Sequence, residues 1–338
     1  MPVVNPEALI ENRVAALQQY HAETGILRAE LDVSGGLDSA VMLGLLAKAL
    51  GPDNVTAAFL GINSSPDALA RAKEVAATFG VKLIILDATE VYQNLVGRMQ
   101  SAMLAAGFDV FEIEARLAKD KTILGGFRSC FRAPLGRAFN RMAGGGIRHG
   151  TGNEDEDRWM RFYQKGGDGE VDTNPIAMLS KGEVFQVARV LGVPMSILNA
   201  RPSPDLWGIG EKHNDEDEIK AYLGLPADCP YTMYSYIDMA TGEYTSVGLI
   251  ERVSRWLDQT DDLLFTHDEF VADRATEPGV LKGYHQFDGI DPDTAKKVLM
   301  GARKVEAMTR HKWNPNCPSL GDRADLVAAG ILTNELPV

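Results

Sequence analysis

Cysteine is scarce in this sequence and is never paired at short spacing. The 338 residues include three cysteines, Cys130, Cys229 and Cys317, which lie far apart and outside any C-x-x-C motif. An odd number of widely spaced cysteines argues against a disulfide framework and against a cysteine-based zinc site. The same usage is typical of a reducing compartment, so we expect a cytoplasmic protein.

Long apolar runs and an excess of positive charge are also absent. No stretch approaches the roughly 18 apolar residues of a membrane span. The N-terminal MPVVNPEALIENRV carries acidic residues where a secretory signal needs basic and then apolar ones. The 34 basic residues are outnumbered by 47 acidic ones, which gives a formal net charge of −13. Because such a surface repels polyanions, we expect neither a membrane nor a nucleic acid as partner.

The most informative stretch is Leu31–Ser39, which reads LDVSGGLDS. Apolar residues alternate with polar ones up to Val33 and predict a strand, and a helical pattern begins at Asp38. The two glycines between them let backbone N–H groups approach a phosphate, and the helix start adds unpaired donors. The motif is not a Walker loop, because GxxxxGK[ST] is absent. Asp38 either holds a divalent cation beside the phosphates or caps the helix.

Strand and helix patterns alternate along the first hundred residues. Residues 5–25 predict an amphipathic helix, and Val55–Leu60 and Val81–Leu86 predict strands on either side of a helix from about 66 to 79. This alternation predicts an α/β fold with a doubly wound parallel sheet and flanking helices. At this length the chain forms one large domain or two small ones. Residues 91–120 look helical and carry no recognisable chemistry.

Polar residues follow the second predicted strand at the edge where such sheets bind ligands. They are Asn63, Ser64 and Ser65, which either bind an adenosine or cap the next helix. Further on, arginines at 128, 132, 137 and 141 recur every four to five residues. Such a series faces either phosphates or solvent.

A second block of motifs runs from Gly150 to Trp207. It opens with GTGN and four successive carboxylates at 154–157, which either surround a cation or form a solvated face. Lys165 and Lys181 bracket the segment GDGEVD. Ser180 and a glutamate three residues later predict a capping box for a helix that ends at Gly192-Val-Pro194.

Taken together, these motifs resemble the ammonia-dependent NAD⁺ synthases, members of the ATP-pyrophosphate-loop (adenine nucleotide alpha-hydrolase-like) superfamily. The matching elements are the NPE helix, SGGLDS, GTGNxxED, FYxKxGDGxVDxNPI with its SK, LGVP, PSxDLW, NDEDEI and a C-terminal HK. They cover residues 5–50, 150–220 and 289–315. The resemblance implies a single ligase domain over 1–338, with 225–288 as an insertion or subunit-contact region, and a homodimer.

The implied reaction is the ATP-dependent amidation of nicotinic acid adenine dinucleotide by ammonia, through an acyl-adenylate, with release of AMP and pyrophosphate. The resemblance implies Asp168 and Lys181 as catalytic residues and Asp38 and Glu156 as Mg²⁺ ligands. Residues implied to bind ATP are Ser34, Gly35, Gly36, Asp38, Ser39, Asn63, Arg132, Thr151, Lys181 and Ser203. Residues implied to bind the dinucleotide or to position ammonia are Phe162, Tyr163, Lys165, Asp168, Asp172, His311 and Lys312.

An acyl-adenylate must be kept from water, and Arg201–Asn214, with two glycines and two prolines, is the expected mobile cover. The chain has no room for a glutaminase domain, so we expect free ammonia or a separate amidase as the nitrogen source.

The sequence also departs from the family pattern. GGGIRH replaces an apolar strand before GTGN, and RSCFRAPLGRAF stands where an adenine-side helix is usual. These departures leave open a ligase of the same fold that amidates another small acid. A nucleotide sensor without catalysis and a tRNA-modifying relative are further alternatives; the latter is disfavoured by the charge and the cysteines.

Overall fold

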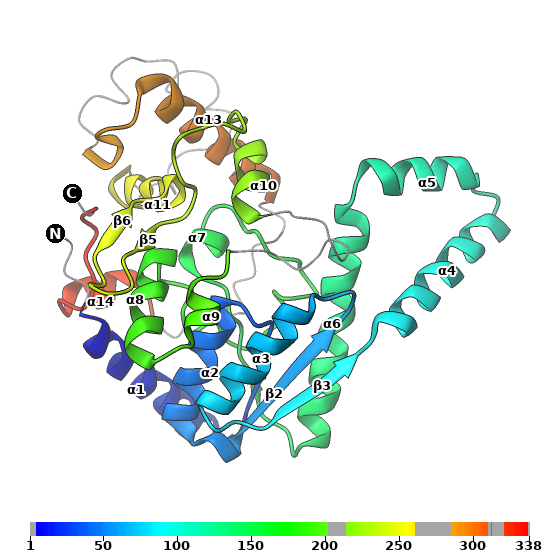
Figure 1. The fold of residues 1–338 in the computed structure, drawn as a ribbon, viewed down its shortest axis with the longest axis horizontal. Helices are drawn as coiled ribbons and strands as arrows, with labels where there is room; N and C mark the ends of the chain where they lie inside the picture. The colour runs from blue at the N-terminus through cyan, green and yellow to red at the C-terminus, as the bar shows by residue number, and fades with distance from the viewer. Residues whose placement is uncertain (1–4, 202–213, 261–284, 310–311, 313–320, 337–338) are drawn as a thin grey trace.

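The structure is a computed structural model that describes residues 5–201, 214–260, 285–309, 312 and 321–336. The main helices and strands along the chain are α1 (Pro6–Thr24), β1 (Ala29–Asp32), α2 (Leu37–Leu50), β2 (Val55–Gly61), α3 (Pro66–Thr78), β3 (Leu83–Asp87), α4 (Thr89–Ala105), α5 (Val110–Lys119), α6 (Thr122–Met142), β4 (Ile147–Arg148), α7 (Glu154–Asp157), α8 (Lys181–Leu191), α9 (Met195–Leu198), α10 (Asp215–Tyr222), β5 (Tyr236–Ile237), β6 (Tyr244–Ser246), α11 (Leu249–Thr260), α13 (Pro292–Thr309) and α14 (Arg323–Ala328). Figure 1 shows their arrangement.

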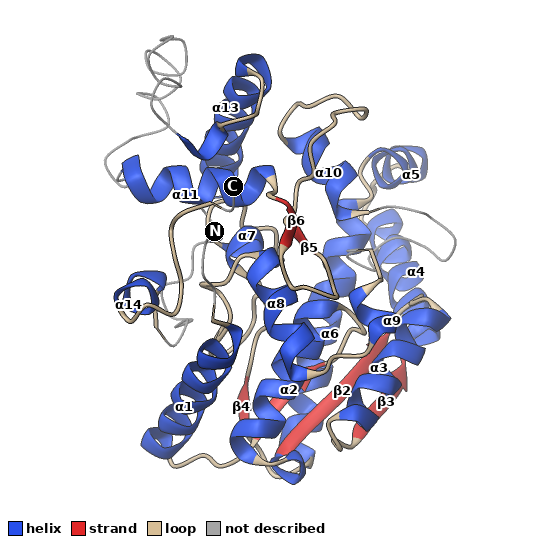
Figure 2. Cartoon of the chain, turned by 60° about the vertical axis from the view of Figure 1, so that its left-hand side comes forward, coloured by secondary structure: helices blue, strands red, loops and turns tan. Residues whose placement is uncertain are grey.

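Four parallel strands form the central sheet in the order β3-β2-β1-β4. Successive side chains of β1 point to opposite faces. Leu31 packs in the core with α2, whereas Glu30 and Asp32 face Gly136 of α6. Helices therefore cover both faces of the sheet (Figure 2), and the predicted doubly wound parallel fold is confirmed.

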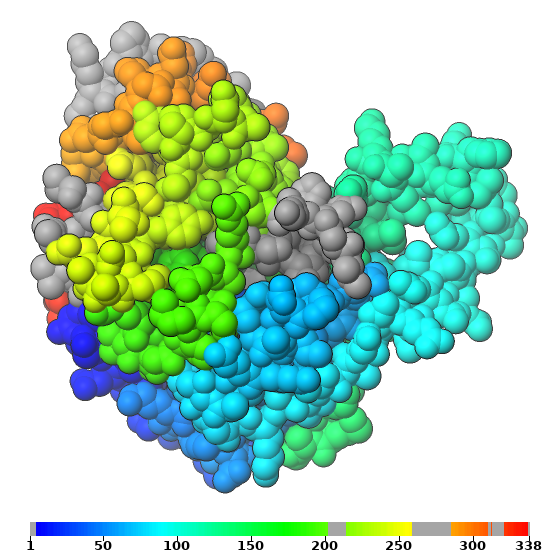
Figure 3. Space-filling view, in the orientation of Figure 1, coloured from blue at the N-terminus to red at the C-terminus, as the bar shows by residue number. Residues whose placement is uncertain are grey.

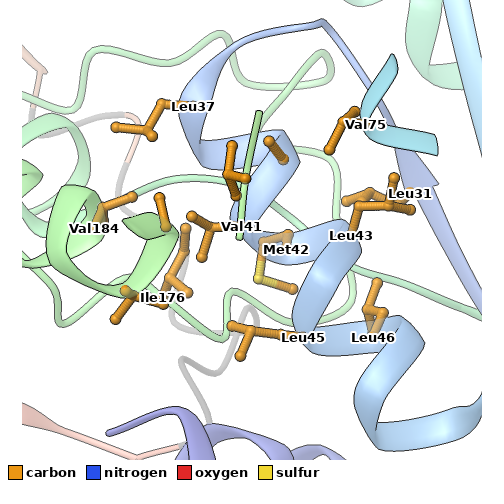
Figure 4. Packing of buried hydrophobic residues seen from close by; sticks show 14 of the residues in the cluster. Leu31, Leu37, Val41, Met42, Leu43, Leu45, Leu46, Val75, Ile176 and Val184 are labelled. Atoms are coloured by element: carbon orange, nitrogen blue, oxygen red, sulfur yellow. The ribbon is translucent and has the colours of Figure 1, made fainter. Parts of the chain in front are cut away.

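The main hydrophobic core lies between the sheet and the helices α1, α2 and α8. Figure 4 shows Val41, Met42 and Leu45 of α2 facing Ile176 and Val184 of the later motif block. The predicted apolar face of the first helix is present, with Leu9, Ile10 and Leu17 buried and Val14 packed against them. This core joins the glycine loop to the second block of motifs, although more than a hundred residues separate them.

A second hydrophobic cluster lies beside the sheet and contains Trp159, just after α7, together with residues of α10, α11 and α13. The described part of 225–288 contributes Met233, Leu249 and Trp256 to it, so this region packs on the rest of the chain. Strands β5 and β6 pair antiparallel, and residues 238–243 form the turn between them. β5 also packs on α8, which brings this segment next to the first core.

The helical character expected over 91–120 is confirmed, and it is divided between two helices. α4 ends at Ala105, Gly107 takes a left-handed φ of 92°, and Asp109 caps α5 by accepting a hydrogen bond from the Glu112 amide. A glycine in this conformation ends a helix at little cost, so the chain turns back here.

Figures 1 and 3 show the two helices projecting from the body as an arm. Tyr92 and Ile113 are the buried side chains on these helices. Phe111, 76% exposed, belongs to a set of exposed apolar side chains on and near the arm, with Val91, Met99, Leu104, Phe108 and Ile123. No helix in the described part of the chain is long and apolar enough to cross a membrane.

Candidate active site

The glycine loop between β1 and α2 has the form of an anion cradle. Gly35 has a φ of +81°, and a Cβ added there would collide with the carbonyl oxygen of Ala68, so this position requires glycine. Gly36 is the N-cap of α2 and makes no side-chain cap bond. Ser34 and Ser39 join their hydroxyl groups at 3.1 Å. The alternative in which Asp38 caps the helix is wrong, because Asp38 lies within the first turn of α2.

Asp38, Glu156 and Lys181 lie together at the start of α2, which follows this loop. The ammonium of Lys181 donates to Asp38 Oδ2 at 2.6 Å and to Glu156 Oε1 at 2.9 Å. Asn153 orients the same aspartate by donating to its Oδ1 at 3.0 Å. The structure thus brings together three residues that the sequence analysis placed at one phosphate site.

Burial and the neighbouring charges have opposite effects on the pKa values in this cluster. Lys181 is 3% exposed, and burial alone would lower the pKa of its ammonium. Asp38 and then Glu156 raise that pKa above its ordinary value, so the ammonium stays charged. Burial raises the pKa of Glu156, and Lys181 partly offsets the rise. The site therefore holds one buried positive charge between two carboxylates.

The four carboxylates at 154–157 point in different directions and do not form one cation site. Glu154 pairs with Arg255 and Arg323, and Asp155 accepts a hydrogen bond from the Lys181 backbone N at 3.0 Å. Asp157 accepts from Asn174, and Glu156 is the member that faces Lys181. A solvated face is equally wrong, since Glu154 and Asp155 are buried.

The short helix α7 is held in place by arginines from later parts of the chain. Arg255 of α11 is fully buried and donates both terminal nitrogens to Glu154. Arg323 of α14 donates to both oxygens of Glu183 at 2.9 Å and lies 3.5 Å from Glu154. Burial would raise the pKa of Glu154, but Arg255 and then Arg323 lower it to about 2. Ser180 and Glu183 form the predicted capping box of α8, which places Lys181 at its first residue.

The GDG segment forms a tight turn against α6. Asp168 is exposed, and its Oδ1 accepts hydrogen bonds from Ser129 Oγ and the Gln164 amide, both at 2.8 Å. Lys165 is exposed, and its carbonyl accepts a bond from Cys130 Sγ at 3.7 Å. These contacts show no link between the Lys165 ammonium and the Lys181 cluster.

Lys312 docks on the same block from the C-terminal part of the chain. Its ammonium donates to the Tyr163 carbonyl at 2.7 Å, and the Tyr163 hydroxyl donates to the Lys312 carbonyl at 2.6 Å. Burial lowers the pKa of Lys312. Phe162 turns toward the second hydrophobic cluster and packs edge-on against Tyr222.

Asp172 belongs to a charged network that the sequence analysis missed. Its Oδ2 accepts from the Arg148 backbone N at 2.8 Å. The Arg148 guanidinium is buried between Glu30 and Asp32 of β1. Burial and then the Asp32 charge raise the pKa of Glu30 to about 7. The departure GGGIRH is thus explained, because its arginine pairs with two acidic residues on the neighbouring strand.

The polar residues at the end of β2 make different contacts. Ser65 caps α3 by accepting from the Ala68 amide at 3.1 Å, so the capping interpretation holds for this serine. Arg132 of α6 reaches the strand end and donates to the Leu60 carbonyl at 3.0 Å and to Ser64 Oγ at 3.4 Å. Asn63 has a left-handed φ of 52° and accepts from Gln93 at 3.2 Å.

Four predictions are not tested by these contacts. Thr151 is half-buried in the loop between β4 and α7. Ser203 and His311 lie outside the described residues, as does 202–213, the greater part of the expected cover.

Asp215 and Tyr234 also belong to the cluster around Lys181. Burial and then Glu156 raise the pKa of Asp215 to about 8. The ring of Tyr234 lies under Lys181, with Nζ 5.1 Å from the ring centroid. The acidic segment NDEDEI was a signal for Asp215, since Asn214 caps α10 there, but no sequence pattern pointed to Tyr234.

This chain is similar in sequence and in fold to known proteins. The sequence is 34% identical over 212 residues to an NH(3)-dependent NAD(+) synthetase of Thermoplasma volcanium, a match that covers 62% of this chain and 74% of the relative. The fold is similar to that of an NAD+ synthetase from Burkholderia pseudomallei, with a TM-score of 0.55, 20% identity and coverage of 92% of this chain and 90% of the other. An NMN synthetase from Francisella tularensis superposes with a TM-score of 0.54 and 25% identity, over 67% of this chain and 84% of the other. A family model for NAD synthase matches residues 9–226, more than half of the sequence, and the chain therefore belongs to the NAD synthase family.

Proposed function

We propose that this protein catalyses the ATP-dependent amidation of nicotinic acid adenine dinucleotide by ammonia, which yields NAD⁺, AMP and pyrophosphate. The observation that carries the proposal is the meeting of Asp38, Glu156 and Lys181 over the glycine loop. A buried ammonium beside a phosphate cradle is suited to a step that builds negative charge on a departing pyrophosphate. Membership of the NAD synthase family supports the same reaction.

The chemistry follows from the weakness of a carboxylate as an acyl donor. A carboxylate oxygen of the substrate attacks the α-phosphorus of ATP, and the bond from that phosphorus to the β-phosphate oxygen breaks. The products of this step are a mixed anhydride and pyrophosphate. Ammonia then attacks the acyl carbon, the electron pair of the breaking C–O bond leaves with AMP, and the nitrogen loses a proton.

The residues of the chain have distinct parts in this scheme. Lys181 binds and neutralises pyrophosphate as it leaves, aided by backbone N–H groups of the glycine loop. Ser34 and Ser39 hold the phosphates, and Thr151 and Ser203 remain predicted ATP contacts. Asn63 follows the carboxyl end of β2 and Arg132 reaches it from α6, and in this proposal both bind the adenosine.

Asp38 and Glu156 fit the requirements of a Mg²⁺ site that also uses phosphate oxygens. They present two carboxylates to one ammonium, and Mg²⁺ is commonly bound by one or two carboxylates plus substrate phosphates. Among the described residues, no group of three or more His, Cys, Asp or Glu side chains is placed to hold a metal alone. Bound Mg²⁺ supplies positive charge that stabilises the phosphate oxygens.

The dinucleotide binds beside the GDG turn in this proposal. Asp168, oriented by two hydrogen bonds, positions the ammonia, and Asp172, fixed by Arg148, contacts the nicotinate ring. Tyr163 and Lys312 flank the same block, with Lys165 and His311 as further predicted contacts. Phe162 acts through packing, because its ring turns into the second cluster.

We expect a homodimer whose contact surface includes the arm of α4 and α5. α5 has 10 residues, fewer than the roughly 12–15 below which an isolated helix is marginal in water. The exposed apolar side chains of the arm, Phe111 among them, would be covered by the same surface of a second copy. The nitrogen source is free ammonia or a separate amidase, and the cysteine usage favours a cytoplasmic location.

The test is to incubate the protein with ATP, Mg²⁺, ammonium and nicotinic acid adenine dinucleotide and to look for NAD⁺ by mass spectrometry. Nicotinic acid mononucleotide is the competing substrate, because the similar Francisella tularensis structure is an NMN synthetase. NAD⁺ formation with a clear preference for the dinucleotide supports the proposal. Preference for the mononucleotide or another acid contradicts it, and ATP binding without AMP release would indicate a sensor. Retention of tRNA on filters would favour the tRNA-modifying alternative.

A further inference from the structure

The ATP site is extended by a stretch of chain beyond the family match. The NAD synthase model ends at residue 226, whereas Tyr234 places its ring 5.1 Å from the Lys181 ammonium. We infer that Tyr234 is a positioning residue for Lys181, whose ammonium it holds against Asp38 and Glu156. The inference rests on the proposed function, because it assigns Tyr234 a part in the same adenylation step.

The ammonium of Lys181 has three N–H donors and no acceptor. Two directions are taken by Asp38 Oδ2 and Glu156 Oε1. The electron-rich face of the Tyr234 ring attracts the cation from another side, and such an attraction is stronger where water is excluded. A fully buried ring in this place also keeps water away from the ammonium. The lysine is therefore held in one orientation before ATP arrives.

The position of the ring is set by the backbone around it. The amides of Met233 and Tyr234 both donate to Glu216 Oε1 at 3.2 Å. The Tyr236 hydroxyl donates to the same oxygen at 3.1 Å. Glu216 belongs to the first turn of α10, next to Asp215. The carboxylate thus fixes this segment against a helix that itself lies at the site.

The hydroxyl of Tyr234 contributes little to this arrangement. It is buried and has no hydrogen-bond partner among the described residues. A buried hydroxyl without a partner costs free energy, so its removal should be tolerated. The contact that matters is then the ring face, which phenylalanine keeps and leucine loses.

The experiment compares Tyr234→Phe with Tyr234→Leu in the full-length chain. ATP binding is measured by calorimetry without dinucleotide or ammonia, and adenylation is measured by ATP–pyrophosphate exchange. We expect Tyr234→Phe to stay within about twofold of the wild type. We expect Tyr234→Leu to lower exchange by about tenfold and to weaken ATP binding, with the KM for the dinucleotide unchanged. Should the leucine variant fail to fold, Tyr234→Met takes its place.

Tyr231→Leu is the matched control, because Tyr231 lies in the same segment but its hydroxyl contacts Gly289 and Asp291 rather than Glu216 or Lys181. It should lower the melting temperature and leave ATP binding unchanged. An equal loss of ATP binding in the Tyr234→Leu and Tyr231→Leu variants would reduce Tyr234 to a packing residue and overturn the inference. An equal loss in Tyr234→Phe would assign the effect to the hydroxyl and overturn it as well. Because ATP binding is measured alone, failure of the wild type to form NAD⁺ would contradict the proposed function separately.

Discussion

Lys181 and Asp38, which are 143 positions apart in the sequence, are joined by a 2.6 Å ion pair above the glycine loop. Asp38 stands in the first turn of α2 and Lys181 is the first residue of α8, so the pair connects the starts of two packed helices. The two starts differ, because Gly36 makes no side-chain cap bond at α2, whereas the Lys181 and Glu183 amides of α8 are taken by Asp155 and Ser180. The start of α2 therefore keeps backbone N–H groups for the proposed phosphates, and α8 supplies the Lys181 ammonium.

Removing the ammonium should slow adenylation far more than it disturbs the fold. We expect Lys181→Ala to reduce ATP–pyrophosphate exchange by at least ~10²-fold, the scale of losing one donor that stabilises transition-state charge. The measurement is the exchange rate, with circular dichroism to check the fold. Lys82→Ala is the control, because that lysine is exposed and lies outside the proposed site, and near-wild-type exchange is expected for it. Exchange in Lys181→Ala within a few-fold of the wild type would refute the proposed role.

Asp38→Asn keeps the shape of the side chain and removes its charge. We expect turnover to be abolished, because the variant loses a proposed Mg²⁺ ligand, while the fold remains intact. The check is calorimetry of Mg²⁺·ATP binding beside an assay of NAD⁺ formation. Asp53→Asn removes a carboxylate that is exposed and should behave as the wild type. Unchanged Mg²⁺ dependence in Asp38→Asn would rule out the metal role.

Gly35 should not accept a side chain. Gly35→Ala would force a Cβ into the Ala68 carbonyl at a φ of +81°, so the loop must shift. We expect ATP affinity to fall at least tenfold, because the backbone N–H groups of the cradle move with the loop. Gly97→Ala, where an added Cβ meets nothing within 4 Å, is the matched control and should leave affinity unchanged. Equal ATP affinities in the Gly35→Ala and Gly97→Ala variants would contradict the proposal that the glycine loop binds phosphate.

The pair of Arg255 and Glu154 should contribute strongly to stability. Arg255→Met leaves a buried carboxylate without its principal partner, and breaking a buried pair costs about 3–5 kcal/mol. Chemical denaturation measures the loss, and Arg116→Met, which breaks an exposed pair with Glu112, should change stability by less than about 1 kcal/mol. The double variant Arg255→Met with Glu154→Gln should recover part of the loss. A loss no greater than that of Arg116→Met would show that the pair is unimportant.

Two buried histidines predict a loss of stability in acid. His21 Nε2 and His149 Nε2 lie 3.0 Å apart, His21 Nδ1 contacts the Ile26 carbonyl, and His149 Nδ1 contacts Thr173 Oγ1. Because the two Nε2 atoms share one hydrogen bond, one ring must accept, and the two rings cannot both be protonated. Burial lowers the pKa of both, that of His149 to about 3.

Because the unfolded state takes up protons first, stability from this pair is complete above about pH 6.5 and falls as the pH drops toward 3. Melting temperatures from pH 7.5 to 4.5 for the wild type and His149→Gln give the test. The wild type should lose more stability over this range than the variant. Parallel curves of melting temperature against pH would show that the histidines take up no protons when the protein unfolds.

The sequence was sufficient to predict those parts of the fold that depend on local pattern. Three such features are found in the structure: the alternation in β1, the glycines of the loop before α2, and the capping box of Ser180 and Glu183. Each depends on residues that are only a few positions apart. The break between α4 and α5 also had a local signal in Gly107 and Asp109, although no boundary was predicted within the helical residues 91–120.

Local sequence patterns could not predict the contacts between distant segments. Arg148 finds Glu30 across 118 positions because β4 pairs with β1, and a single sequence does not show that pairing. Tyr234 reaches Lys181 for a similar reason, since its place depends on Glu216 and on the packing of α10. Asp38, Glu156 and Lys181 were found because their motifs resemble a known family, and their spacing along the chain does not by itself reveal that they converge.

The contacts of Arg323 with α7 and α8 have a consequence for the stage of translation at which these helices can be fixed in place. Arg323 pairs with Glu183 of α8 and approaches Glu154 of α7, so both pieces of the proposed phosphate site depend on a residue that is made well after them. While the ribosome is still adding α13, neither helix has this partner. A nascent chain is therefore expected to complete this arrangement only after Arg323 has been made, and chains truncated before residue 323 should be inactive.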